Sequence, residues 1–357
     1  MQKIMGDAIM PSHASFANNE PFHFVFASDE KFTVQLQVAI LSLVKASFGK
    51  RNLQHIHVLD CGISDDTWSK ISLRVYSLAK RYSVCVEISR HNIDMSLFGR
   101  FKDWNTSKAT YARLLLPDLL PDVRYCVYSD GDMLFFKNPW ELVEQLTYKG
   151  VAILGHKNSI DGGFTNPDER WFSYVNEPYN RDTYFCAGLV AMDLDKFRAL
   201  GAVERMLDFL ARHPDSVTAD QPALNWFFRN DSSLEEGGWG IFPIECFGDN
   251  YEIKAIHYAG GTPWKNCDSW YKYLIMRQQD ELWYDFAAKI LGGEVTKRKT
   301  LLTARVLGRI AFLVTFAIVK FRLTLPSKER YLRLFDDMLH KHSQYDSAQM
   351  KLMADID

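Results

Sequence analysis

Short apolar runs and longer amphipathic segments alternate along most of the chain. Runs rich in aromatic and β-branched residues predict strands, and segments whose apolar residues recur every three or four positions predict helices. The strands are expected at residues 22–27, 55–60, 84–88, 125–128, 151–154, 184–193 and in a run that ends at residue 257. The helices are expected at residues 34–46, 64–82, 105–116 and 195–212, and from residues 139 and 221 onward.

This order of elements predicts an α/β fold, with a mainly parallel central sheet and helices on its faces. Open sheets of this kind bind ligands at the carboxyl ends of their strands, where the loop Ser28–Phe32 is expected. The glycine-rich dinucleotide fingerprint is missing from that loop, which argues against an ordinary NAD-binding domain. Residues 157–181 are rich in Asn, Asp, Gly and Pro, and predict a long binding loop or lid.

The strongest candidate for chemistry comes after the predicted strand at residues 125–128 and consists of Asp130, Gly131 and Asp132. Residues i and i+2 of an extended chain point to the same side, so the two carboxylates can converge. Gly131 allows another group to approach the backbone closely. A hard divalent cation would offset the cost of placing two carboxylates there. Similar triplets occur at residues 193–195 and 355–357, so a turn or a helix cap stays open for this spacing.

Three further residues allow two interpretations each. Arg113 is either a surface arginine with a packed stem or a clamp for diphosphate oxygens. Asp220 fits a helix N-cap as well as it fits a ligand-binding carboxylate. His257, at the end of a strand, is either a hydrogen-bonded structural residue or a nitrogen ligand that would complete a carboxylate site for Mn²⁺.

Composition divides the 357 residues into a frayed N-terminus (1–20), a catalytic domain (21–292) and a basic tail (293–357). The formal net charge is −2, yet residues 297–333 hold ten Lys or Arg and one acid. The six cysteines are scattered, without a C-x-x-C pair, which favours free thiols of a reducing compartment. The first residues also lack the apolar core of a signal peptide, so a cytoplasmic location is expected.

The tail contains an uncharged apolar run, residues 310–319, which is far shorter than the ~20 residues that span a bilayer. One interpretation is a buried helix that docks on the catalytic domain. The other is an anchor at the inner face of the cytoplasmic membrane, with the basic residues of 297–333 facing anionic lipid. No nucleic-acid partner is expected, because the basic segment lacks interleaved stacking aromatics.

Five motifs occur together in a recognisable order: F-A-S-D-E-K-F, T-Y-A-R, Y-S-D-G-D, F-C-A-G with A-D-Q-P-A-L-N, and H-Y-A-G-G-T-P-W. Across residues 22–270 the chain therefore resembles the family 8 retaining glycosyltransferases, which include bacterial lipooligosaccharide galactosyl- and glucosyltransferases and glycogenin. The resemblance implies a GT-A fold, a UDP-sugar donor and Mn²⁺, with Mg²⁺ as the alternative ion. It also implies a glycan or lipid-linked acceptor, as in surface polysaccharide or lipopolysaccharide synthesis.

The resemblance also assigns roles by matching positions. Asp130, Asp132 and His257 would hold the metal. The catalytic residues would be Gln221, which would lie nearest the anomeric carbon on the acceptor side, and Asp220, which would bind hydroxyls of the donor sugar. The positions that would bind the donor are Ala27, Asp29, Lys31, Phe32, Arg113, Asp130, Gly131, Ala187, Gly188, Asp220, Gln221 and Gly260.

Two positions depart from the family pattern. Cys186 stands where members usually have Asn, and Thr262 stands where they usually have Lys, although Lys265 is a candidate replacement. Two rival functions stay open. A D-x-D phosphatase would usually need Thr or Val after the second aspartate, where this chain has Met133. A non-catalytic module that binds nucleotide sugars or carbohydrate is the other.

Overall fold

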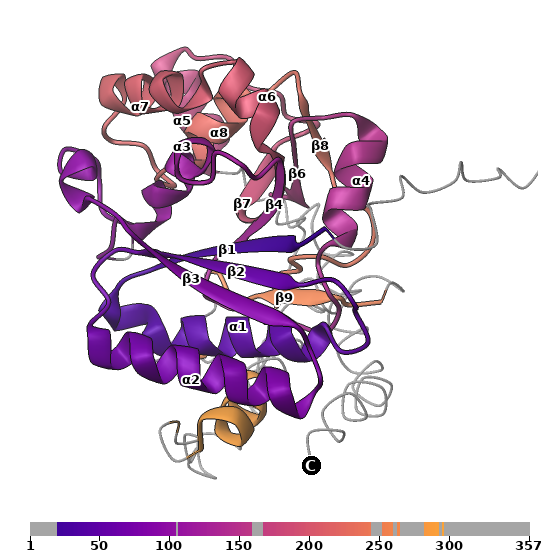
Figure 1. The fold of residues 1–357 in the computed structure, drawn as a ribbon. Helices are drawn as coiled ribbons and strands as arrows, with labels where there is room; N and C mark the ends of the chain where they lie inside the picture. The colour runs from indigo at the N-terminus through magenta and orange to yellow at the C-terminus, as the bar shows by residue number, and fades with distance from the viewer. Residues whose placement is uncertain are drawn as a thin grey trace, which may run out of the picture.

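The computed structural model describes residues 20–104, 106–158, 167–243, 252–259, 263–264, 282–292 and 295. Its main sheet has seven strands in the order β3-β2-β1-β4-β7-β6-β8 (Figure 1). These strands are β1 (Phe22–Ser28), β2 (Gln54–Asp60), β3 (Val86–Asn92), β4 (Tyr125–Ser129), β6 (Ile153–Lys157), β7 (Phe185–Asp193) and β8 (Ser232–Leu234). Strands β3, β2, β1 and β4 are parallel, whereas β7 runs antiparallel to both β4 and β6. The predicted α/β fold with a mostly parallel sheet is confirmed.

Apolar cores lie on both faces of the sheet. One is built with α1 (Thr33–Ala46), α2 (Asp65–Arg81) and α4 (Glu141–Lys149), and includes Phe24 and Ile40. The opposite core includes Val25 and Phe209. It is built with the elements η3 (Ala109–Leu115), α3 (Leu116–Leu119), α5 (Pro167–Val175), α6 (Leu194–Ala199), α7 (Ala202–Arg212) and α8 (Gln221–Phe227). Alternate residues of β1 enter opposite cores, as the two-residue period of a strand requires.

A second, two-stranded sheet joins distant parts of the chain. Strand β5 (Met133–Phe135) pairs antiparallel with β9 (Ala255–His257), and Met133 lies directly opposite His257. This register brings the residue before Met133 close to the end of β9. It is the structural reason that a histidine so far along the chain reaches the D-G-D turn.

Two predicted helices differ from the structure. Residues 195–212 form two helices, α6 and α7, because Gly201 adopts a left-handed conformation with φ of 57° between them. Residues 105–116 were expected to form one helix that Pro117 ends. Instead η3 is a 3₁₀ helix, and Pro117 lies in the first turn of α3, where its missing N–H costs nothing.

The predicted long loop at residues 157–181 is partly wrong, because α5 occupies much of it. Residues 159–166 lie outside the described residues, as do residues 1–19 and nearly all of the predicted tail. In the ranges that the structure describes, no helix combines the length and the apolar character needed to cross a membrane. The four cysteines described, Cys61, Cys85, Cys126 and Cys186, are free thiols.

Candidate active site

The D-G-D turn and the end of β9 form a compact group of three potential metal ligands. The Nε2 atom of His257 lies 3.2 Å from Oδ1 of Asp132 and 3.9 Å from Oδ2 of Asp130. One ligand atom from each residue lies within 4.8 Å of the other two. The backbone fixes this arrangement, since the N–H of Tyr258 donates to the carbonyl of Asp132 at 2.9 Å. The site is thus held by sheet pairing, and its parts come from segments more than 120 residues apart in the sequence.

The charges of this group fit a bound cation. Burial alone would lower the pKa of His257, but the Asp132 carboxylate more than offsets it and the pKa is raised well above the ordinary value. Oδ1 of Asp132 is buried and has no hydrogen bond. The site therefore stabilises positive charge, and a divalent ion would supply it while the imidazole gives up its proton. The side chains of Asp130 and Asp132 keep 30% and 15% exposure, so solvent reaches the pair.

Two glycines make room for this geometry. A Cβ atom on Gly188 would lie 2.2 Å from Cε1 of His257, which is far inside van der Waals contact. The carbonyl of Gly188 also accepts the N–H of Asp130 at 2.7 Å. A Cβ on Gly131 would lie 3.3 Å from both Phe32 and Leu36. Gly188 thus lets the imidazole lie against β7, and Gly131 lets the turn approach α1 closely.

Arg113 is 2% exposed, so the interpretation as a surface arginine is wrong. Its guanidinium pairs with Asp130 at 2.9 Å and with Asp220 at 2.9 Å, and it lies over the Tyr128 ring with 4.2 Å to the centroid. Burial alone would lower the pKa of Arg113, yet the two carboxylates raise it. The Tyr128 hydroxyl donates a further hydrogen bond to Asp130 at 3.0 Å. Asp130 is therefore held by two partners that leave its second oxygen facing His257.

Asp220 occupies the N-cap position of α8, but its side chain makes no capping hydrogen bond. The carboxylate instead pairs with Arg113 and accepts a hydrogen bond from the Thr110 hydroxyl at 2.5 Å. Burial raises the pKa of Asp220 to about 6, against the opposing effect of Arg113. Asp220 thus lies at the predicted N-cap position, but its carboxylate does not cap the helix.

Gln221 follows Asp220 and is held at both ends of its amide. Its Oε1 accepts the N–H of Ala187 at 3.0 Å, and its Nε2 donates to Asp168 at 2.9 Å. Asp168 is fully buried and also accepts hydrogen bonds from the hydroxyls of Tyr184 and Thr218, at 2.8 and 2.7 Å. Burial raises the pKa of Asp168. The sequence does not mark Asp168, because it lies in the segment 157–181, whose composition predicts a loop.

The first βα loop borders the same turn. Ala27 is buried near the carboxyl end of β1. Asp29 caps the short 3₁₀ helix η1 (Glu30–Phe32) by accepting the N–H of Lys31 at 3.0 Å. Lys31 is exposed, and the half-buried Phe32 ring meets Trp264 edge to face, with 5.7 Å between centroids. The contacts of these residues with a donor nucleotide stay predictions.

The two departures from the family pattern have different outcomes. The thiol of Cys186 lies 3.7 Å from Nδ1 of His257, on the side of the ring that faces away from Asp132. It is therefore a direct neighbour of a candidate metal ligand. Thr262 and Lys265 lie outside the described residues, as does Gly260.

The comparison with protein families decides the assignment. The model of glycosyl transferase family 8 matches residues 23–268, which is more than half of the chain. The chain belongs to this family. Membership makes it a glycosyltransferase, which favours sugar transfer over the phosphatase interpretation.

Individual relatives agree with this membership. General stress protein A of Bacillus subtilis is 24% identical over 218 residues, which cover 58% of this chain and 69% of that protein. The galactosyltransferase LgtC, solved with donor and acceptor sugar analogs, has a similar fold. Its TM-score is 0.59 at 19% identity, over 80% of this chain and 99% of LgtC. The glycosyltransferase GlyE of Streptococcus pneumoniae has a TM-score of 0.54 at 17% identity, over 83% of this chain and 64% of its own.

Proposed function

We propose that this protein is a Mn²⁺-dependent retaining hexosyltransferase that moves galactose or glucose from a UDP-sugar to a glycan or lipid-linked acceptor. The observation that carries the proposal is the meeting of Asp130, Asp132 and His257 within the reach of one ion, at the carboxyl end of β4. LgtC, a relative in fold, was solved with sugar donor and acceptor analogs, which supports the same class of substrate.

The three side chains would hold the ion against the diphosphate of the donor. Two carboxylates and one imidazole suit Mn²⁺, whereas Mg²⁺ prefers an all-oxygen shell. A divalent ion at this point stabilises the negative charge that develops on the departing diphosphate. Arg113 and Tyr128 contribute by holding Asp130 in place, because both contact its Oδ1.

Retention by this site is best explained by attack from the face that the leaving group occupies. The bond between the sugar C1 and the β-phosphate oxygen breaks, and its electron pair leaves with UDP. The acceptor oxygen forms the new bond to C1 on the same face and passes its proton to the departing phosphate oxygen. A double displacement would need a free carboxylate nucleophile. Gln221 is an amide held at both ends, and Asp220 is 1% exposed and paired with Arg113.

Calorimetry with UDP and a hydrolysis screen test this proposal. UDP should bind much more tightly with Mn²⁺ than without it, and one of UDP-Gal, UDP-Glc, UDP-GlcNAc and UDP-GalNAc should be hydrolysed slowly. Asp132→Asn should abolish both effects. Asp195→Asn is the matched control, because Asp195 belongs to another D-x-D triplet and its side chain is 57% exposed. Metal-independent UDP binding would refute the proposed site, and UDP binding without turnover of any donor would favour a binding module.

We also propose a place for the reaction, the cytoplasmic face of the membrane, where a lipid-linked acceptor would be available. The support is the basic composition of residues 297–333. In a flotation assay, the full chain should bind vesicles that contain phosphatidylglycerol and not vesicles of phosphatidylcholine alone. Arg305→Glu with Arg309→Glu should weaken this binding. Equal binding of both proteins would contradict the anchor.

A further inference from the structure

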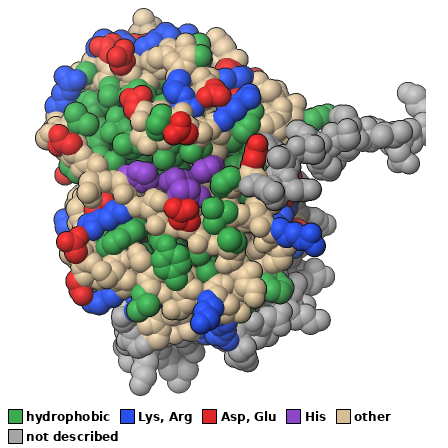
Figure 2. Space-filling model, in the orientation of Figure 1, with side chains coloured by type: hydrophobic (Ala, Val, Ile, Leu, Met, Phe, Trp, Pro, Cys, Tyr) green, Lys and Arg blue, Asp and Glu red, His purple; other side chains and the backbone are tan. Residues whose placement is uncertain are grey.

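A stripe of histidines crosses the sheet away from the candidate active site. We use the name histidine stripe for His23 on β1, His55 and His57 on β2, and His91 on β3. The register pairs His23 with His55, and the two-residue spacing of β2 turns His55 and His57 to the same face. Figure 2 shows histidine side chains gathered at the surface, across the middle of this view of the molecule.

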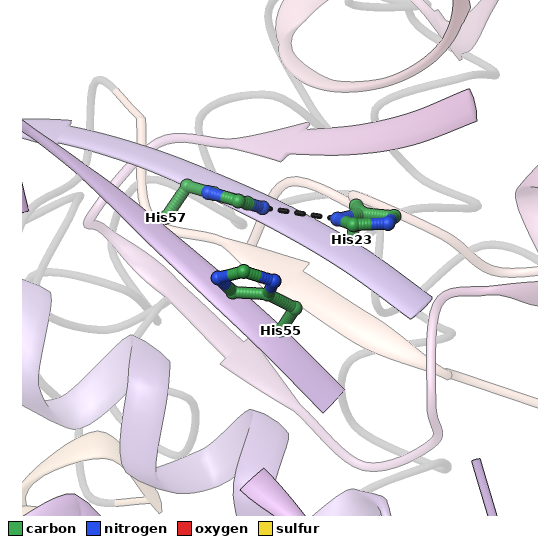
Figure 3. A group of neighbouring side chains, drawn as sticks. All are labelled: His23, His55 and His57. Carbon is green, nitrogen blue, oxygen red and sulfur yellow. Dashed lines mark hydrogen bonds between the residues drawn. The ribbon is translucent and has the colours of Figure 1, made fainter. Parts of the chain in front are cut away.

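Figure 3 shows the rings of His23, His55 and His57 close together, with a hydrogen bond between His23 and His57. Nδ1 of His23 lies 3.0 Å from Nε2 of His57, and the ring of His55 stacks on that of His57 with 4.0 Å between centroids. One nitrogen from each of the three rings lies within 4.8 Å of the other two. Two nitrogens bound to one tetrahedral zinc are about 3.3 Å apart, given Zn–N bonds of about 2.0 Å. The three nitrogens are thus close enough for one ion, and binding would require the stacked rings to turn, because an imidazole nitrogen binds a metal in the plane of its ring.

We propose that His23, His55 and His57 form a second metal site, which binds Zn²⁺ through three imidazole nitrogens. Imidazole ligands suit Zn²⁺, whereas Mn²⁺ and Mg²⁺ prefer sites with carboxylate oxygens. A water molecule would take the fourth coordination position of the ion, because His23 and His55 are only partly buried and the site faces solvent.

Neighbouring side chains are placed to orient the ligands. Nδ1 of His57 lies 3.1 Å from Nε2 of His91, so an N–H at Nδ1 can donate to His91 while Nε2 binds the ion. Ser89 lies 2.8 Å from Nε2 of His55, and Glu87 lies 4.0 Å from the same atom. Metal-binding histidines usually have such partners, which fix the tautomer and the ring orientation.

The position of the stripe indicates a structural role. His23 lies at the amino end of β1 and Ser28 at its carboxyl end, a separation of roughly 16 Å along an extended strand. His57 pairs with Val25, which lies about 10 Å from Ser28 along the strand, so the stripe is separate from the loop that follows β1. The stripe also shares no residue with the group of Asp130, Asp132 and His257. A zinc ion at the stripe would cross-link β1 to β2 and so stabilise the pair of strands from which the loop Ser28–Phe32 leaves the sheet.

Metal titration of the full chain, freed of metal by chelation, tests the site. Zn²⁺ is added against a chromophoric chelator, and Co²⁺ is used in parallel for its visible spectrum. The Asp132→Asn variant lacks the carboxylate site, and in this variant one equivalent of Zn²⁺ should still bind at the histidine stripe. Excess Mn²⁺ should not displace it. His23→Gln and His55→Gln should each weaken Zn²⁺ at least tenfold and remove the Co²⁺ band, because glutamine keeps a hydrogen-bonding side chain without the imidazole.

His213→Gln is the matched control, since His213 is a partly buried histidine paired with Glu177 outside the stripe. Circular dichroism of each variant in chelator shows whether it folds. Loss of all Zn²⁺ binding in Asp132→Asn would overturn the proposal. So would unchanged binding in a folded double variant of His23 and His55, which would leave the stripe as a hydrogen-bonded set of neutral imidazoles.

Discussion

Gly188→Ala is the most direct test of how the candidate active site is built. The new methyl group would lie 2.2 Å from Cε1, 2.7 Å from Nε2 and 2.9 Å from Nδ1 of His257. Ordinary carbon contacts begin near 3.5 Å, so the ring must move by about 1 Å. Metal sites tolerate shifts of only about 0.2 Å in ligand distance. We therefore expect the affinity for Mn²⁺ to fall by about 10- to 100-fold, the range typical of disrupted ligand positioning.

Stability should fall as well, because overpacking a buried site costs about 1–3 kcal/mol. The control is therefore a variant that is overpacked elsewhere on the same sheet. A Cβ on Gly155, which lies on β6, would meet the side chains of Phe185 and Val190 at 3.0 Å. Gly155→Ala should lose stability without losing metal affinity.

Calorimetric titration with Mn²⁺ and urea denaturation of both variants give the two quantities. The expected pattern is a stability loss in both and a loss of Mn²⁺ affinity in Gly188→Ala alone. Wild-type Mn²⁺ affinity in a folded Gly188→Ala protein would show that His257 is not a metal ligand. Equal affinity losses in the two variants would show that metal binding follows general stability, and that Gly188 has no specific role in positioning His257.

Of three further predictions, two concern single side chains. Cys186→Ala should weaken Mn²⁺ binding by less than about tenfold in calorimetry, because it removes only a weak partner of a ligand imidazole. Asp220→Asn should lower the free energy of unfolding in urea by about 3 kcal/mol, because Arg113 would lose a buried partner. The third prediction concerns pH. Burial lowers the pKa of His23 to about 4 and that of His57 to about 2, so both stay neutral when folded. In the presence of chelator, the free energy of unfolding should therefore keep its full value above pH 6.5. It should decrease as the pH falls toward 4, because the imidazoles take up protons in the unfolded state and stay neutral in the folded state. Urea denaturation at several pH values measures this free energy.

The hydrophobic pattern predicted the fold better than it predicted the helix ends. In strand runs such as Phe22–Ser28 every residue except His23 is buried, so composition alone identifies them. The breaks were harder to predict. A single glycine such as Gly201 inside an apolar helical pattern is usually compatible with a continuous helix. The break between α6 and α7 follows from the left-handed conformation of Gly201, which the sequence does not reveal. Pro117 reads as a stop, yet tertiary packing places it in the first turn of α3.

The candidate site was predictable where local motifs mark it, and only there. The spacing of Asp130 and Asp132 identifies the D-G-D turn in the sequence, but the partners of Asp130 depend on long-range contacts. Arg113 reads locally as a surface residue, and only the fold shows that it is buried between two acids. Asp168 carries no motif at all, and its role follows from the hydrogen bond to Gln221.

The histidine stripe results from a regularity that a search for short motifs does not detect. Phe22 pairs with Gln54 and Gln54 with Val86, so each of the first two βα units advances the register by 32 residues. His55 follows His23 by 32 residues and His91 follows His57 by 34, and both intervals differ from the register by an even number, so the side chains line up on one face.

Strand β1 connects the two proposed metal sites. It carries His23, a proposed zinc ligand, near its amino end and leads into the predicted donor loop at its carboxyl end. An ion that fixes β1 to β2 would reduce the freedom of that loop without contacting the donor. Zinc at the stripe should therefore change the affinity for UDP rather than the metal requirement of transfer. A change in the Mn²⁺ requirement itself would instead mean that zinc had entered the carboxylate site.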